Sequence, residues 1–293
     1  MEKECGCKGV RYCALCLDSE RVRRLDFASG READPAAWRS RLAPLTFHRF
    51  CSLCQSAFPD PSLSPDSLHL FNQLHSTDFH QTHGEERLEV EGLLVLEDLV
   101  SPGEEEDLVA EIDSLPWLPS QSGRRKQDFG PRVNFNKKKV KSDRFIGVPS
   151  YCDSLLARMS SLSPALTDYV PLEQCNLEYE PSRGATIEFH KDDEWVWGER
   201  LISVNLLSGS VMTLIQEEKG LAIIVPMLRR SLLAMFASIR HDWLHGILPC
   251  HIWGRRIALT MREPEEKFLS SGPLYDQYGA DLLKRCKLRV SIN

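Results

Sequence analysis

The chain has 293 residues, which is enough for one large domain with a well-covered core and a small additional segment. Its composition, 42% hydrophobic and 27% charged, is ordinary for a soluble protein. The formal net charge of −6 excludes a protein that is basic over its whole surface, so any basic contact surface must be local.

We predict neither a secretory signal nor a membrane-spanning segment. Residues 2–4 are charged and lead into cysteines rather than into an apolar run. The longest apolar stretch, residues 221–237, is interrupted by Pro226, Arg229 and Arg230. We therefore expect a cytoplasmic and nuclear protein without membrane insertion, in which cysteines do not form a disulfide framework.

Cysteines are concentrated at the start of the chain, where six of the ten lie within 54 residues. A C-x-C pair followed by C-x2-C supplies four thiolates within twelve residues, enough for one tetrahedral Zn(2+), and the later C-x2-C pair could replace a member or serve a second site. Free cysteines in a mobile tail are the alternative. We predict a Cys-rich, zinc-binding segment over residues 1–55. The candidate ligands are Cys5, Cys7, Cys13, Cys16, Cys51 and Cys54.

Residues 56–86 are rich in Ser, Pro, Asp and His and show no helical or strand period, so we predict a flexible linker there. Its four scattered histidines are expected to be solvated. Residues 87–293 form the predicted main domain. It begins with a strand near 87–100, and Ser101, Pro102 and Glu104 then have the pattern of a capped helix start.

Residues 120–145 are rich in Lys and Arg, contain three Phe and have no apolar period. They could form a solvated hairpin or loop, or a surface that contacts substrate, with Arg124, Arg125 and Lys126 among the candidate residues. Short strand-like segments recur after residue 170 and predict a sandwich or barrel. One further helix is expected within residues 275–290.

A possible metal site lies in the segment EFHKDDEW. His190 and Asp192 are two residues apart, so on an extended chain both side chains leave the same face. His245 or the competing His241 could add a second imidazole, and two histidines with one carboxylate leave three positions open on an iron. A solvated turn and a packed core histidine are the alternatives.

The segment RIALTMR has an apolar face and a polar face. On a strand, Arg256, Ala258, Thr260 and Arg262 share one face, and the two arginines are about 20 Å apart. They could flank different parts of one site, where guanidinium matches carboxylate in a bidentate manner. An ordinary surface strand is the alternative.

Together these motifs resemble the AlkB family of Fe(II)- and 2-oxoglutarate-dependent dioxygenases, in which H-x-D, a distal H and R-x-N-x-T-x-R occur in this order. Here they read His190-Lys191-Asp192, His245 and Arg256 to Arg262, with Ala258 where many members carry asparagine. The segments ECGCKGVRYCALC, SQSGRRKQDFGPRVNF and DDEWVWGERLISVNLLS are similar to the fourth animal branch of the family.

The resemblance implies an α+β fold, a double-stranded β-helix (a distorted jelly roll) with flanking helices. It also implies Fe(2+) held by His190, Asp192 and His245, with O2 as cosubstrate. The residues implied for 2-oxoglutarate are Arg256, Arg262, Tyr179 and Thr260. The acidic residues implied to face the substrate are Asp193 and Glu194.

The implied activity is oxidative demethylation of N-methyl groups. The first expected substrate is monomethylated lysine of actin, with a role in actomyosin and cytokinesis, and N6-methyladenine in DNA is the second. A catalytically inactive, zinc-stabilised adaptor that binds protein or nucleic acid through the jelly roll and the basic loop is the alternative.

Overall fold

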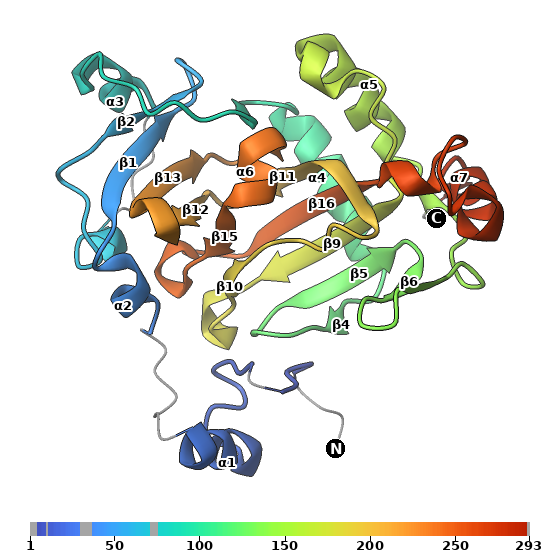
Figure 1. Ribbon diagram of the computed structural model, residues 1–293, viewed down its shortest axis with the longest axis horizontal. Coiled ribbons are helices and arrows are strands. Elements are labelled where there is room, and N and C mark those ends of the chain that lie inside the picture. Colours follow the sequence, from blue (N-terminus) through green and yellow to red (C-terminus); the bar gives the residue numbers. More distant parts are fainter. Residues whose placement is uncertain (1–4, 10, 30–36, 71–75, 292–293) are drawn as a thin grey trace.

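The computed structural model describes residues 5–9, 11–29, 37–70 and 76–291, and its main body consists of two β-sheets (Figure 1). The six-stranded sheet has the order β10-β15-β12-β13-β1-β2, with bounds Ile187–His190, Leu244–Ile247, Ser210–Gln216, Leu221–Met227, Thr46–Cys51 and Ser56–Pro59. The seven-stranded sheet has the order β3-β14-β11-β16-β9-β5-β4, with bounds Leu93–Leu96, Leu232–Met235, Trp197–Leu206, Arg256–Pro264, Glu173–Tyr179, Arg125–Phe129 and Leu118–Pro119.

From β9 onward the chain winds back and forth between the two sheets. Strands β9, β11, β14 and β16 belong to the seven-stranded sheet, and β10, β12, β13 and β15 belong to the six-stranded sheet. The neighbouring pairs among these eight strands are antiparallel. This winding is a double-stranded β-helix, so the predicted α+β fold with a distorted jelly roll is confirmed.

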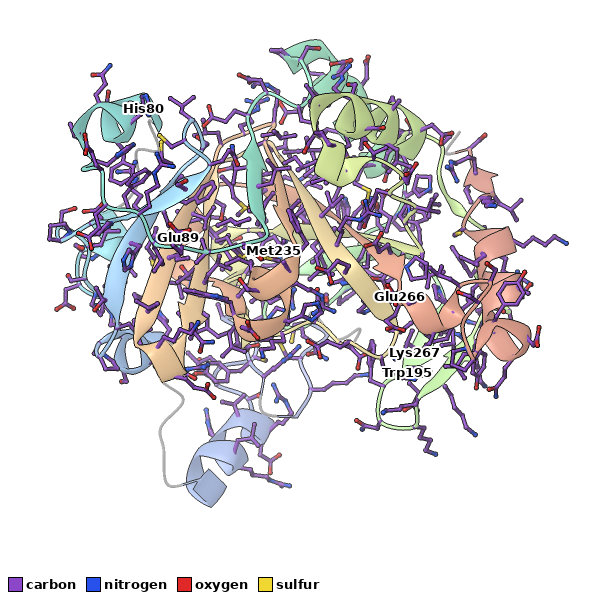
Figure 2. All side chains as sticks on the ribbon, turned by 45° about the horizontal axis from the view of Figure 1, so that its top comes forward. His80, Glu89, Trp195, Met235, Glu266 and Lys267 are labelled. Atoms are coloured by element: carbon purple, nitrogen blue, oxygen red, sulfur yellow. The ribbon has the colours of Figure 1, made fainter. Side chains whose placement is uncertain are left out.

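The main core lies between the sheets, and strand β13 shows why. Its residues Ile223 and Val225 pack into the core between the sheets, whereas Ala222 and Ile224 pack into a second apolar cluster on the other face. Side chains alternate on a strand, so a continuous apolar run is expected where both faces are covered. Figure 2 shows Met235 of β14 in the interior, while His80 lies at the outer edge of the molecule.

Helices and short elements complete the fold. The α-helices are α1 Glu20–Ser29, α2 Trp38–Leu42, α3 Ser76–Thr82, α4 Pro102–Asp113, α5 Cys152–Leu162, α6 Ala237–Asp242 and α7 Ala280–Arg285. Two small sheets pair β8 Val148–Pro149 with β17 Arg289–Val290, and β6 Arg132–Asn134 with β7 Lys139–Lys141. Single turns of 3₁₀ helix occur at Leu68–Leu70, Pro164–Leu166, Pro181–Arg183, Glu217–Lys219, Pro249–His251 and Glu266–Phe268, and a π-helix spans Tyr275–Gly279. Within the described ranges no helix is long and apolar enough to cross a membrane.

The predicted boundary between residues 55 and 56 falls inside a β-hairpin. Strand β1 pairs in parallel with β13, and β2 pairs antiparallel with β1. Residues 46–59 therefore extend the six-stranded sheet, and describing 56–59 as linker is wrong. The hairpin forms because Phe50 of β1 and Ala57 of β2 are buried in the main core. The composition of residues 56–86 indicated a loop and gave no sign of this burial. The rest of the division into segments stays a prediction.

Helix α4 begins as expected and is tied to the sheet by a buried carboxylate. Ser101 caps it, with Glu104 completing a capping box. Glu105 is fully buried; it accepts a hydrogen bond from the backbone N–H of Leu207 at 2.7 Å and one from Arg229 Nε at 2.6 Å. These bonds attach the helix to the end of β11 and to the β13–β14 connection.

We expect Glu105→Ala to lower the free energy of unfolding by about 2 kcal/mol, because it leaves a buried N–H without an acceptor and an arginine without its partner. Urea unfolding followed by circular dichroism measures the change. Glu106→Ala is the matched control, since Glu106 is the adjacent exposed glutamate, and it should change stability by less than about 0.5 kcal/mol. Equal effects in the two variants would contradict this role.

Candidate active site

The structure brings His190, Asp192 and His245 together. His190 is the last residue of β10 and pairs in antiparallel register with His245 on β15. The two imidazole ring centres are 4.3 Å apart, and one ligand atom from each of the three residues lies within 4.8 Å of the others. Two imidazoles on neighbouring strands and one carboxylate just after β10 form a facial donor set that fits iron.

Neighbouring groups orient the three side chains. His190 Nδ1 lies 2.8 Å from the Glu188 carbonyl oxygen, so an Nδ1–H donates to it and leaves Nε2 free for a metal. Burial lowers the pKa of His245 to about 3, so it is neutral at pH 7. Burial raises the pKa of Asp192, but the charge of Arg262, together with the hydrogen bond from His190 and the charges of the two histidines, holds that pKa well below its usual value.

Arg262 contacts both oxygens of Asp192. Its Nε lies 3.1 Å from Oδ2, and its Nη2 lies 3.2 Å from Oδ1. Its Nη1 donates to Glu173 at 2.6 Å, so the guanidinium is held between two carboxylates. The resemblance implied that Arg262 binds 2-oxoglutarate, whereas its hydrogen bonds here fix the position of Asp192. Glu173 was not singled out from the sequence.

Arg240 of α6 holds the backbone that follows β10. It is 2% exposed, and its guanidinium donates to the carbonyl oxygens of Asp192 and Asp193 at 3.0 Å each. Burial lowers its pKa. The sequence contained no signal for this role, because Arg240 lies 48 residues from Asp192 and belongs to no motif.

A second buried arginine faces the same cavity. Arg256 is 1% exposed, its Nε donates to Asn205 Oδ1, and its guanidinium carbon lies 4.8 Å from the centre of the Tyr179 ring. Its Nη1 is buried and has no hydrogen-bond partner among the described residues. An unsatisfied buried N–H of a guanidinium is costly, and a ligand carboxylate would satisfy it.

The cavity joins the three metal-site residues to this arginine. Its lining includes Tyr179 and Thr260, which the resemblance implied for the cosubstrate. Arg256 and Arg262 lie on one face of β16 at opposite ends of the site, in agreement with the spacing argued from the strand. Asn205 of β11 was missed from the sequence; its side chain donates to the carbonyl oxygens of Ser208 and Leu228 and so orients the oxygen that Arg256 uses.

The competing histidine and the two acidic neighbours have other partners. His241 contacts Glu199 at 2.9 Å and Glu194 at 3.1 Å and does not join the metal-site residues. Asp193 accepts hydrogen bonds from the backbone N–H groups of Trp195 and Val196. Asp193 therefore stabilises the turn, and Glu194 remains an exposed carboxylate beside His241.

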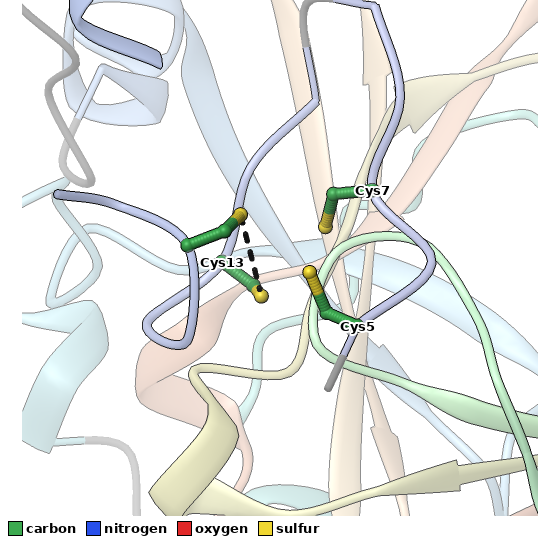
Figure 3. Close-up of side chains that lie close together, drawn as sticks. Cys5, Cys7 and Cys13 are labelled. Carbon is green, nitrogen blue, oxygen red and sulfur yellow. Dashed lines mark hydrogen bonds between the residues drawn. The ribbon is translucent and has the colours of Figure 1, made fainter. Parts of the chain in front are cut away.

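Four N-terminal cysteines also converge. One sulfur atom from each of Cys5, Cys7, Cys13 and Cys16 lies within 4.8 Å of the others, and Figure 3 shows three of these side chains turned toward a common centre. The Cys13 and Cys16 sulfurs are 3.8 Å apart, the separation expected for two thiolates at about 2.3 Å from a tetrahedral zinc. This cluster could bind zinc. Cys51 and Cys54 are not part of it.

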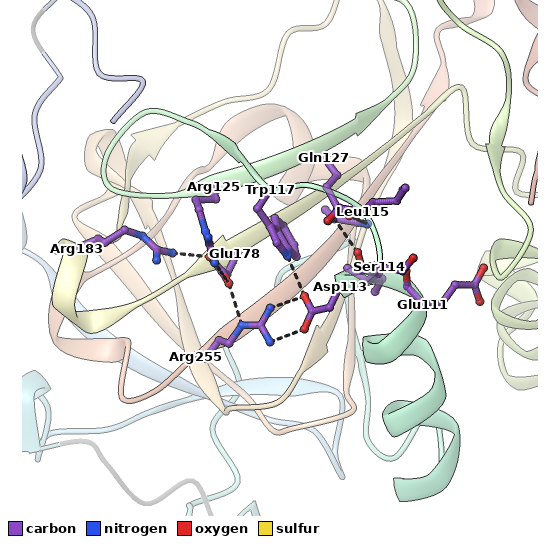
Figure 4. A network of polar contacts seen from close by, with 12 residues as sticks. Glu111, Asp113, Ser114, Leu115, Trp117, Arg125, Gln127, Glu178, Arg183 and Arg255 are labelled. Atoms are coloured by element: carbon purple, nitrogen blue, oxygen red, sulfur yellow. Dashed lines mark hydrogen bonds and ion pairs between the residues drawn. The ribbon is translucent and has the colours of Figure 1, made fainter. Parts of the chain in front are cut away.

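The predicted basic loop is partly a strand whose charges are paired. Residues 125–129 form β5, where Arg125 makes a two-pronged ion pair with the buried Glu178 and Lys126 pairs with Asp128. Glu178 also accepts from Arg183 and Arg255 (Figure 4). Arg124 is 7% exposed and donates to a backbone carbonyl. Arg124 is therefore buried, and Arg125 and Lys126 are paired within the chain although their side chains stay partly exposed.

Exposed lysines lie on the β6–β7 hairpin instead. Lys137, Lys138 and Lys139 are exposed at its tip, and Phe135 is 46% exposed. The Phe135 ring lies edge-on to Trp197, 6.5 Å between centres, and Arg262 lies 5.8 Å from the same Trp197 ring. The Trp197 ring thus lies between Phe135 of the hairpin and Arg262, which holds Asp192.

No family model matches the chain. A Caenorhabditis elegans protein described as "DNA N6-methyl adenine demethylase" is 43% identical over 293 residues, covering 100% of this chain and 97% of that protein. Mouse and human proteins described as "Alpha-ketoglutarate-dependent dioxygenase alkB homolog 4" are 35% and 34% identical, each over 96% of this chain and 93% of that protein. With this identity over nearly the full length, the chain belongs to the AlkB family of Fe(II)- and 2-oxoglutarate-dependent dioxygenases.

Proposed function

We propose that this enzyme removes the methyl group from N6-methyladenine in DNA. The observation that carries the proposal is one cavity that joins His190, Asp192 and His245 to the unpaired N–H of Arg256. The first group fits Fe(II), and the second fits the far carboxylate of 2-oxoglutarate. The relative described as acting on N6-methyladenine in DNA covers the whole chain.

Each residue has a distinct task in this proposal. His190, Asp192 and His245 hold the metal, while Arg262 and Arg240 keep Asp192 and its backbone in place. Arg256 binds and orients the cosubstrate, and Tyr179 and Thr260 line the space beside it. Iron with 2-oxoglutarate and O2 supplies the oxidation that hydroxylates the N-methyl group, which then leaves as formaldehyde.

The β6–β7 hairpin supports DNA as the substrate. Exposed lysines at its tip can neutralise phosphates, and the half-exposed ring of Phe135 offers a surface on which an unpaired base could stack. The Phe135 ring lies beside Trp197, whose ring in turn contacts Arg262, the partner of Asp192. A methylated base must leave the duplex or be single-stranded to reach such a site.

Three further expectations from the sequence concern an actin substrate, an inactive adaptor and the location in the cell. Monomethylated lysine of actin stays a prediction and forms the second arm of the substrate test below. The inactive adaptor is disfavoured, because the chain belongs to a family of dioxygenases and its three metal-site side chains converge. A cytoplasmic and nuclear location also stays a prediction.

Single replacement of His190, Asp192 or His245 by alanine should lower 2-oxoglutarate-dependent succinate release by about 100-fold or more, because each removes one metal ligand. Iron bound per chain, measured on the same samples, should fall in parallel. His241→Ala is the control and should retain activity within about threefold, since the hydrogen bonds described for that side chain are to two exposed glutamates, Glu194 and Glu199. Loss of activity in His241→Ala with normal activity in His245→Ala would reverse the assignment.

Arg256→Met should raise the KM for 2-oxoglutarate by about 10- to 100-fold while changing kcat much less, because a charge-assisted carboxylate contact is lost. The test compares 2-oxoglutarate with 2-oxobutyrate, which lacks the far carboxylate. The wild-type preference for the dicarboxylate should shrink in the variant. A preference as large as that of the wild type would place the carboxylate contact elsewhere.

Formaldehyde release should be faster on single-stranded DNA containing N6-methyladenine than on a monomethyl-lysine actin peptide at equal concentration. Lys137→Glu should lower kcat/KM on the DNA by about three- to tenfold and reduce its salt dependence, since one phosphate contact is reversed. Lys219→Glu makes the same charge change at an exposed position on the β12–β13 turn and should have little effect. Formaldehyde release from the peptide and not from the DNA would mean that the substrate is methylated protein rather than DNA.

A further inference from the structure

A second group of metal-binding side chains lies away from the active site and away from the N-terminal cysteine cluster. Cys51 is the last residue of β1, Cys54 lies in the β1–β2 turn, and His80 and His83 come from α3 and the residue that follows it. One ligand atom from each lies within 4.8 Å of the others. Figure 2 shows His80 at the outer edge of the molecule, and Figure 1 shows α3 beside β1 and β2, far from the N-terminal segment.

We propose that Cys51, Cys54, His80 and His83 form a structural zinc site that fastens α3 to the β1–β2 hairpin. Two thiolates and two imidazoles are a donor set that selects zinc and fills a closed tetrahedral site. The C-x2-C pair lies on a tight turn, as in zinc knuckles, and the two histidines lie about one helical turn apart.

The distances match such a site. A tetrahedral zinc with bonds of about 2.3 Å to sulfur and 2.0–2.1 Å to nitrogen places a sulfur and a nitrogen about 3.6 Å apart. Cys54 Sγ lies 3.2 Å from His80 Nδ1 and 3.4 Å from His83 Nε2, and Cys51 Sγ lies 3.7 Å from His80 Nδ1. All three separations fall close to the tetrahedral value.

Surrounding groups hold His83 in the orientation that a metal requires. Its Nδ1 lies 2.8 Å from the Gly84 carbonyl oxygen, so an Nδ1–H donates there and the Nε2 lone pair faces Cys54. The imidazole stacks on Phe58, with 3.7 Å between ring centres and 16° between planes. Such an arrangement fixes both the tautomer and the ring position before a metal binds.

The local packing indicates why a metal is needed. The apolar cluster beneath α3 consists of Cys51, Phe58 and Phe79 with Cys54 at its edge, and it is separate from the main core. Three buried side chains stabilise a seven-residue helix only weakly. Four bonds to zinc would replace the missing core and tie two segments that are about 30 positions apart.

The first test counts zinc in the full-length protein by mass spectrometry under native conditions. Cys54→Ser and His83→Ala should each contain one zinc fewer than the wild type. Cys13→Ser, in the N-terminal cluster, should lose a different zinc. The double variant Cys13→Ser/Cys54→Ser should therefore contain two zinc ions fewer. His69→Ala removes an exposed histidine outside both clusters and should leave the count unchanged. Because zinc can also enter the iron site, the difference between variants is the decisive number. An unchanged count in Cys54→Ser overturns the proposal.

The second test needs no variant and so does not depend on folding of an altered chain. In the zinc-loaded wild type, N-ethylmaleimide should modify Cys51 and Cys54 at least about tenfold more slowly than after a strong chelator has removed zinc. Cys250, outside both clusters, should react at the same rate in both states. Recovery of a Cys51–Cys54 disulfide, or equal reactivity before and after chelation, would mean that the two cysteines bind no zinc.

Discussion

The site depends on the antiparallel register of β10 and β15, which sets His190 opposite His245. A shift of one residue would turn one imidazole to the other face of the sheet, because side chains alternate along a strand. The register is in turn held by β12, which pairs with β15 from the other side. The two histidines therefore approach each other because of backbone hydrogen bonds between strands rather than through any contact of their own.

The buried charged side chains around these two histidines have partners that compensate their charge. Arg262 lies between Asp192 and Glu173, and Arg240 is surrounded by backbone carbonyl oxygens of the turn after β10. Burial of an unpaired charge costs several kcal/mol, so these partners are what permit a carboxylate in the interior. Arg256 differs from both because one of its N–H groups is left without a partner among the described residues, and this is the N–H to which the proposed function assigns the far carboxylate of 2-oxoglutarate.

The N-terminal cysteine segment contacts β10, the strand that ends at His190. Cys7 accepts a hydrogen bond from the backbone N–H of Ser122, whose hydroxyl donates to Glu188 at 3.0 Å. Arg11 also pairs with Glu188 at 3.3 Å, two residues before His190. The segment thus packs against the start of the metal site, although half-exposed ion pairs of this kind contribute little stability by themselves. A zinc in the four-cysteine cluster would hold these contacts in place.

The sequence by itself determined the fold class, the capped start of α4 and the placing of His190 beside Asp192, because each depends on local periodicity or on a short motif. It left His241 and His245 as competitors, and only the pairing of β15 with β10 separated them. Asn205, Glu173 and Arg240 could not be found, since each acts through a partner more than 40 positions away. His80 and His83 were expected to be solvated, because the segment around them resembles a linker in composition. His80 is exposed and His83 is half-buried, but only tertiary structure sets both beside Cys51 and Cys54, because the pairing of β1 with β13 and β2 carries the two cysteines to α3.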